Sequence, residues 1–132
     1  MGNGIQGCFG GELYKEYYAE PLEIKGGLTY NFASTNMNFE IAPKSTEVIL
    51  NWDDARLYCF ALNIDGKTGW RLPTKEELFA IYQSRNDFVE SYYWSSAEFN
   101  TSNAWRQNFV NGSQLTNGKF NSYCVRAIRS VI

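Results

Sequence analysis

Hydrophobic and polar residues change their spacing twice along this 132-residue chain. Residues 22–50 are extended in character, because a Gly-Gly pair separates two apolar stretches and a β-branched run follows. Between residues 51 and 82 the apolar positions recur at helical spacing in two blocks. After residue 90 two Asn-Gly pairs interrupt alternating stretches, as in strands joined by tight turns. Strands, two helices and an antiparallel meander together predict an α+β domain.

The first predicted helix begins after Asn51, which is a favourable N-cap residue. Asp53 and Asp54 then fall in the first turn, where the helix dipole favours negative charge. Apolar residues recur at helical spacing from Trp52 to Leu62. We therefore predict an amphipathic helix that packs one face on a core.

The second predicted helix follows the segment GWRLPTKEEL, residues 69–78. Pro73 disfavours helix at the residue before it. Thr74 and Glu77 have the spacing of a capping box, in which each side chain bonds to the other residue's backbone N–H. We expect this junction to fix a helix against the core and to do no chemistry.

Arg71 lies beside an apolar position in the same segment. A guanidinium close to a core needs a carboxylate or several carbonyl groups. Glu76 and Glu77 are the candidate partners, so we predict that Arg71 is structural.

The last third of the chain predicts hairpins. Asn111-Gly112 is a hairpin signal, and Asn117-Gly118 predicts a second turn. Residues 123–131 alternate as a closing strand. In the strand before the first turn, Trp105, Gln107 and Phe109 share one face, and Arg106, Asn108 and Val110 share the other.

Charge and composition exclude several classes of protein. The net charge of −2 and the pI near 5.1 give no basic surface for nucleic acid. No apolar run approaches the roughly 20 residues that span a membrane. The N-terminal residues have neither the basic start nor the apolar core of a signal peptide.

The residue inventory also argues against catalysis and metal binding. The chain has no histidine, which excludes Ser-His and Cys-His nucleophile systems. None of its three cysteines forms a CxxC pair, so no zinc site is predicted. No tripeptide typical of calcium lectins is present, and hard cations need about six oxygen ligands. We expect no enzyme activity, no metal and no cofactor. The remaining paired carboxylates, Glu76, Glu77, Glu90 and Glu98, are explained by capping or solvation.

Five separated motifs carry a resemblance to a known family. NWDDARLYC, GWRLPTKEEL, YYWSSAEFN, NAWRQNFVNG and YCVRAIRS stand in this order between residues 48 and 130. Together they resemble the C-type-lectin-like domains of bacterial and phage surface proteins, in particular the C-terminal domain of a collagen-like bacterial adhesin. Phage tropism determinants, treponemal variable proteins and formylglycine-generating enzyme are more distant kin. Residues 1–47 match no such motif, so we expect an N-terminal arm and strands over 1–47 and the lectin-like domain over 48–132.

The resemblance implies a fold and a set of structural residues. Two helices should flank a twisted antiparallel sheet, with the N- and C-terminal strands close together. Cys59 and Cys124 occupy places that are often joined by a disulfide in such folds; the alternative is two buried thiols. Cys8 is expected to be free. Structural roles are expected for Trp70, Arg71, Glu77, Trp94, Trp105, Phe109, Arg126 and Arg129.

The resemblance also implies a ligand-binding region over residues 100–117. This part is rich in Asn, Ser, Thr, Gln and aromatic residues, a composition that suits adaptable recognition surfaces. The alternative is that these residues are there because they form turns. In phage tropism determinants this part of the fold displays the receptor-contacting residues. The candidates are Asn100, Thr101, Ser102, Asn103, Arg106, Asn108, Asn111, Ser113, Gln114 and Asn117.

We therefore predict a non-catalytic, calcium-independent binding module that recognises a host surface glycan or protein. One setting is a phage virion surface, with residues 1–20 docked on other virion proteins and a trimer as a plausible assembly. The other setting is a bacterial cell surface or the extracellular space. An alternative is a structural virion protein, for decoration, fibre or tail, without a ligand. An enzyme of the formylglycine-generating type is disfavoured, because Cys59 and Cys124 lack any local sign of its copper site.

Overall fold

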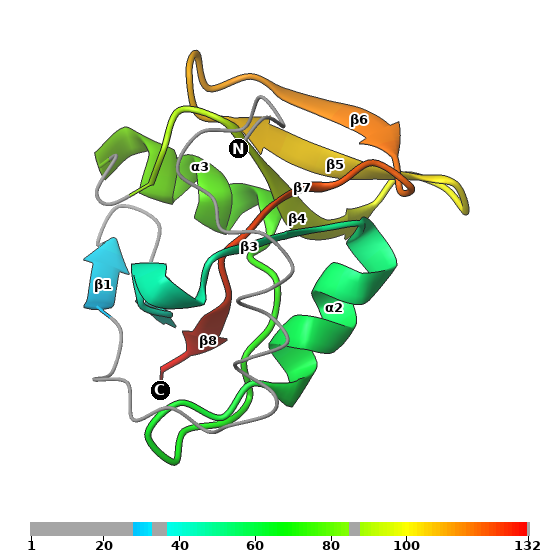
Figure 1. Cartoon of the computed structure of the whole chain (residues 1–132). Coiled ribbons are helices and arrows are strands. Elements are labelled where there is room, and N and C mark those ends of the chain that lie inside the picture. The colour runs from blue at the N-terminus through cyan, green and yellow to red at the C-terminus, as the bar shows by residue number, and fades with distance from the viewer. Residues whose placement is uncertain (1–27, 33–36, 85–87, 132) are drawn as a thin grey trace.

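The computed structural model describes residues 28–32, 37–84 and 88–131 (Figure 1). The described part is α+β, which confirms the predicted fold class. The predicted arm over residues 1–20 and its docking lie outside the described residues. In chain order the elements are β1 (Leu28–Phe32), β2 (Met37–Ile41), the 3-10 helix η1 (Lys44–Thr46), β3 (Val48–Leu50), α2 (Trp52–Ala61), α3 (Lys75–Ser84), β4 (Tyr92–Glu98), β5 (Asn103–Asn108), β6 (Gln114–Gly118), β7 (Tyr123–Val125) and β8 (Ile128–Ser130).

The described strands form two sheets. One has the strand order β1-β2-β8 and the other the order β3-β7-β4-β5-β6. The pairing of β2 with β8 joins the beginning and the end of the described chain, as the resemblance implies. The strand pairs are antiparallel as expected, with one exception: β7 lies between β3 and β4 and runs parallel to β4. Phe39 and Ile41 of β2 are core residues, so the packed unit includes strands before residue 48.

Helix α2 begins as predicted. The Asn51 side chain accepts a hydrogen bond from the Asp54 backbone N–H at 2.9 Å, which satisfies one of the free donors at the helix start. The helix buries Trp52, Ala55 and Tyr58 and leaves its opposite face exposed. This buried face joins the first core cluster, with sheet residues that include Val48, Trp94 and Val125.

Helix α3 begins at the predicted capping box. The Thr74 backbone N–H donates to Glu77 Oε1 at 2.8 Å, and the Glu77 backbone N–H donates to Thr74 Oγ1 at 3.1 Å. Leu78 and Ile81 of α3 pack with Phe109 in a second core cluster. Since each strand sends alternate side chains to opposite faces, the five-stranded sheet lies between α2 and α3.

The predicted disulfide between Cys59 and Cys124 is wrong. Cys59 is a free, buried thiol, whereas Cys124 is disulfide-bonded to a residue other than Cys59. Alternation along β7 explains this. Val125 faces the core cluster beside α2, which contains Cys59. Its neighbour Cys124 faces the opposite core cluster, beside α3. The expectation that Cys8 is free concerns a residue outside the described part of the chain.

The turns of the meander are only partly as predicted. Asn111-Gly112 lies in the turn between β5 and β6, and Gly112 has the positive φ of 84° that favours glycine. The second turn lies later than predicted, because Asn117 and Gly118 pair with β5 and end strand β6. The predicted closing strand is two short strands, β7 and β8, which belong to different sheets.

A buried ion pair stands where the chain passes from β7 to β8. Arg126 Nη2 lies 3.1 Å from Glu47 Oε2, and both side chains are almost fully buried. The Tyr93 hydroxyl donates to the same carboxylate oxygen at 2.6 Å. Arg126 Nη1 also donates to the Ala42 carbonyl at 3.2 Å. These contacts connect the residues on either side of the short helix η1 to both sheets. Glu47 was not identified from the sequence as the partner of Arg126.

Candidate functional site

The ten predicted ligand-binding residues do not share one surface. They divide among the loop between β4 and β5, the β5–β6 hairpin, and the two opposite faces of β5 and β6. The contacts of each group therefore differ.

The loop between β4 and β5 is held by its own side chains. Asn100 Oδ1 accepts from the backbone N–H groups of Ser102 and Asn103, at 2.9 and 2.8 Å. Lys119, the residue after β6, closes the loop, because its ammonium donates to the Thr101 carbonyl at 3.0 Å. Thr101 and Ser102 are exposed, but the Asn100 side chain is occupied by forming the loop.

The asparagines of the β5–β6 hairpin also form turns. Asn108 Oδ1 accepts from the Val110 N–H at 2.7 Å, and Asn111 Oδ1 accepts from the Ser113 N–H at 2.9 Å. These are local side-chain contacts of the kind that favour asparagine in turns. Turn formation is therefore sufficient to explain why asparagine stands at these two positions.

Gln114 lies on the sheet face that carries α3. Its Nε2 donates to the Lys75 carbonyl at 2.8 Å and to Gln107 Oε1 at 2.7 Å. Both contacts join β6 to the start of α3 and to β5. Gln114 is thus separated by the sheet from Arg106, which points to the other face.

Arg106 and Asn117 meet on that other face of β5 and β6. Arg106 is only 7% exposed, and its Nε donates to Asn117 Oδ1 at 2.6 Å. The guanidinium carbon lies 3.9 Å from the ring centroid of Tyr92, a cation–π geometry. Arg106 Nη1 is buried and has no hydrogen-bond partner. Within the described residues no carboxylate pairs with Arg106.

Two tyrosines and a leucine complete this surface, which we call the Arg106 face. Tyr92 and Tyr123 meet edge to face at 5.3 Å. Burial raises the pKa of Tyr123, and the charge of Arg106 partly opposes the shift. Leu115 lies opposite Arg106 in the β5–β6 register and is 53% exposed. The Arg106 face comprises Tyr92, Arg106, Leu115, Asn117 and Tyr123.

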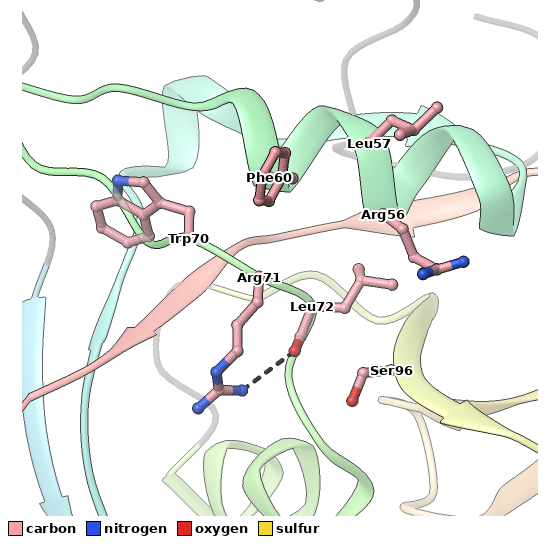
Figure 2. A pocket seen from close by; sticks show the side chains of 7 residues that line it. All are labelled: Arg56, Leu57, Phe60, Trp70, Arg71, Leu72 and Ser96. Atoms are coloured by element: carbon pink, nitrogen blue, oxygen red, sulfur yellow. Dashed lines mark hydrogen bonds between the residues drawn. The ribbon is translucent and has the colours of Figure 1, made fainter.

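A second candidate is a cavity of about 290 Å³ beside α2, which Figure 2 shows. The segment WRL within residues 69–78 lines this cavity as well as preceding helix α3. Phe60 is 80% exposed at its edge. The lining residues are Arg56, Leu57, Phe60, Trp70, Arg71, Leu72 and Ser96.

The charged groups of this cavity are already engaged. Arg71 donates to both Glu77 carboxylate oxygens at 2.8 and 2.9 Å, and to the Ser130 hydroxyl at 2.9 Å. Figure 2 shows its guanidinium turned away from Phe60. Arg56 lies 4.0 Å from Asp53 and over the Trp52 ring. The cavity offers apolar contact area but no buried, unpaired polar group.

A family model described as the Lcl C-terminal domain matches residues 26–129. The chain belongs to the Lcl C-terminal domain family. This membership confirms the resemblance found in the five motifs, and it indicates a surface or adhesin-type domain. The match also begins before residue 48, in agreement with the strands β1 and β2. A search of curated proteins found no matching relative.

In this Lcl C-terminal domain the predicted structural residues are mostly buried and bonded. Trp70 and Trp94 donate their indole N–H groups to the carbonyls of Lys67 and Leu50, at 2.9 and 3.1 Å. Phe109 is 2% exposed. Trp105 is only half-buried, and the ammonium of Lys75 lies over its ring, 3.5 Å from the ring centroid. Arg129 donates to the Thr68 carbonyl at 3.0 Å and to Glu40 Oε1 at 2.9 Å.

The carboxylates of the domain are bound in ion pairs. Burial alone would raise the pKa of Glu77, but the hydrogen bonds from Arg71 and Thr74 outweigh it and lower that pKa below its usual value. Burial also favours a higher pKa for Glu40, but the hydrogen bonds from Lys67 and Arg129 outweigh it and lower that pKa.

Among the described residues no group of three or more acidic or cysteine side chains is arranged to hold a metal. No helix in the described part is long and apolar enough to cross a membrane.

Proposed function

We propose that this Lcl C-terminal domain is a non-catalytic, calcium-independent binding module that contacts a host surface glycan or protein through the Arg106 face. The observation that carries the proposal is the buried guanidinium of Arg106 with its unpaired Nη1. Leaving a buried donor unpaired costs about 1–3 kcal/mol, and more for a charged group. Such groups are rare in folded proteins and are often explained by function.

The surroundings of Arg106 suit recognition. Tyr92 and Tyr123 give rigid aromatic contact area, and Asn117 gives an adaptable amide. The strands β4, β5, β6 and β7 hold these residues, so little entropy is lost when a partner binds. The predicted loop residues Thr101 and Ser102 stand at one end of β5 and can extend the contact.

The absence of catalysis and of calcium is part of the proposal. Each of three glutamates forms an ion pair with an arginine, which leaves it poorly suited to act as an acid, a base or a calcium ligand: Glu40, Glu47 and Glu77.

We further propose that the domain lies on a surface, either of a virion or of a bacterial cell. The family match supports a surface or adhesin-type domain.

Binding of the labelled full chain to intact cells and to a glycan array, with and without a chelator, tests this function. We expect saturable binding that the chelator does not change. Binding that disappears with the chelator would contradict calcium independence. If a folded protein in its native oligomer binds no cell and no glycan, the domain is a structural surface protein without a ligand and the proposal fails.

A further inference from the structure

We infer that Cys8 is the disulfide partner of Cys124, so that a covalent bond joins the N-terminal segment of the chain to strand β7. Cys124 is disulfide-bonded, and Cys59 is a free thiol. The sequence contains three cysteines, and the structure is a single chain. Cys8 lies outside the described residues, but it is the one cysteine left to supply the second sulfur. The pairing replaces the free Cys8 expected from the sequence.

The fold excludes Cys59 from this bond. Cys59 packs in the core cluster beside α2, and Cys124 packs in the opposite cluster beside α3. The five-stranded sheet separates the two side chains, whereas the Cα atoms of bonded cysteines are at most about 7 Å apart. Burial also raises the pKa of the Cys59 thiol, which suppresses the thiolate that disulfide exchange needs. The fold thus leaves Cys8 and Cys124 as the pair that reacts.

The position of Cys124 decides what the bond anchors. β7 is flanked by β3 and β4 in the five-stranded sheet, where Cys124 pairs with Ile49 and Tyr93. The Cys124 side chain is fully buried, in the apolar cluster that contains Phe39 and Phe109. A sulfur in these surroundings is shielded from attacking thiols, since exchange needs direct access to it. The bond therefore joins the N-terminal segment to the centre of the domain and resists reduction while the domain is folded.

Most of the chain lies between the two bonded cysteines. The loop that the bond closes includes both helices and the described strands from β1 to β6. A disulfide stabilises a folded protein mainly by restricting the unfolded chain, and the effect grows with the length of the closed loop. The bond should therefore contribute strongly to the stability of the full chain.

Formation of the bond needs an oxidant that accepts two electrons. One thiolate attacks a disulfide of a small molecule or of an exchange protein, and the second thiolate then displaces this carrier from the mixed disulfide. Cys8 and Cys124 together lose two electrons and two protons, and the oxidant leaves as two thiols. Such oxidants act outside the reducing cytoplasm. The bond thus fits the proposed surface setting, but its assignment does not rest on that proposal.

Peptide mapping without reduction tests the pairing. The full chain is refolded in a mixture of oxidised and reduced glutathione, its remaining thiols are alkylated in denaturant, and it is digested with trypsin. The three cysteines then fall in three peptides, residues 1–15, 57–67 and 120–126. We expect residues 1–15 to be linked to residues 120–126, and Cys59 to be alkylated. Alkylated Cys124, or Cys124 linked to Cys59 or to the Cys124 of a second copy, would overturn the inference.

Two single variants measure what the bond contributes. Cys8→Ser should lower the melting temperature by about 10 °C, because the unfolded chain is no longer cross-linked. The native protein refolded in dithiothreitol should lose the same amount, and Cys8→Ser should lose nothing further there. Cys59→Ala is the matched control, since it removes a cysteine but should keep residues 1–15 linked to residues 120–126. Equal melting temperatures for the oxidised native protein and Cys8→Ser would contradict the bond.

The peptide map and the binding assays have separate outcomes. If the cross-linked peptide is found and the domain binds no cell or glycan, the proposed function fails and the pairing stands. If the domain binds its ligand and Cys124 is alkylated, the pairing fails and the proposed function stands.

Discussion

At the scale of single residues, the partners of each arginine separate structural roles from a candidate binding role. Arg71 contacts Glu77, the Leu72 carbonyl and Ser130, so it joins α3 to β8. Its own backbone also exchanges two hydrogen bonds with Ile128, at 2.8 and 2.9 Å. Arg106 has one polar partner and an unpaired nitrogen. The same residue type thus joins two elements through a carboxylate at one place, and lies without a carboxylate partner among the described residues at the other.

Replacing Arg71 by alanine is expected to destabilise the domain by about 1–3 kcal/mol, because hydrogen bonds to charged groups are lost and Glu77 stays half-buried without its partner. Arg56→Ala is the control, since its side chain is 58% exposed, lies 4.0 Å from an exposed Asp53 and otherwise stacks on the Trp52 ring. Chemical denaturation of both variants measures the difference. An unchanged unfolding free energy for Arg71→Ala would show that the junction does not depend on this side chain.

The lowered pKa of Glu77 predicts how stability depends on pH. The carboxyl has a usual value of 4.5 and a lower value in the folded protein. Its contribution is therefore complete above pH 4.5 and is lost as the pH falls through the folded value. The unfolding free energy of the native protein should fall as the pH drops below 4.5, and Glu77→Gln should flatten this fall. Identical pH slopes for both proteins would contradict this pairing.

At the scale of elements, local signals in the sequence were enough for both helices. Asn51 caps α2 and the Thr74–Glu77 box begins α3, because capping depends only on residues within one turn. Strand pairing was less predictable, since β7 inserts between β3 and β4 through contacts distant in sequence. The turn after β6 was misplaced because the pairing with β5 carries Asn117 and Gly118 into the strand.

The candidate site was predictable only in part. Arg106 and Asn117 were identified from composition and resemblance, and their adjacency needed the register of β5 and β6. Tyr92 and Tyr123 were missed; each is the half-buried first residue of its strand and is followed by buried residues. Glu47 was missed because nothing local distinguishes it; only the fold brings it to Arg126.

Cys59 should be unreactive in the folded protein. It is fully buried on the α2 side of the sheet, and burial raises the pKa of its thiol, so almost no thiolate forms at neutral pH. Alkylation with iodoacetamide at pH 7.5, followed by peptide mass spectrometry, should modify Cys59 only after denaturation. Rapid labelling of the native protein, or a Cys59–Cys124 cross-linked peptide, would be inconsistent with the core described above.

The buried Glu47–Arg126 pair should matter more than any surface pair. Glu47→Ala leaves Arg126 charged and buried, and breaking such a pair costs about 3–5 kcal/mol. Glu76→Ala, at an exposed position in the first turn of α3, is the control and should change stability by less than about 0.5 kcal/mol. Denaturation midpoints compare the two. Equal stabilities would mean that the Glu47–Arg126 contact contributes little.

At the scale of the whole molecule, the Arg106 face is supported from behind by the five-stranded sheet and by α3. The cavity beside α2 is a separate surface, formed by the segment that begins with Trp70. The central claim is that binding depends on the first of these surfaces and not on the second. Arg106→Gln changes the first surface and Arg56→Gln changes the second, so the affinities of these two variants distinguish which surface binds the ligand.

The most direct measurement is the affinity of the native protein, Arg106→Gln and Arg56→Gln for the same cell-bound or array-bound ligand. All three proteins should first show the same folded spectrum. We predict that Arg106→Gln weakens binding at least about tenfold, equivalent to 1.4 kcal/mol, and that Arg56→Gln stays within about threefold of the native protein. Equal affinities for the native protein and Arg106→Gln, or a loss confined to Arg56→Gln, would contradict the account.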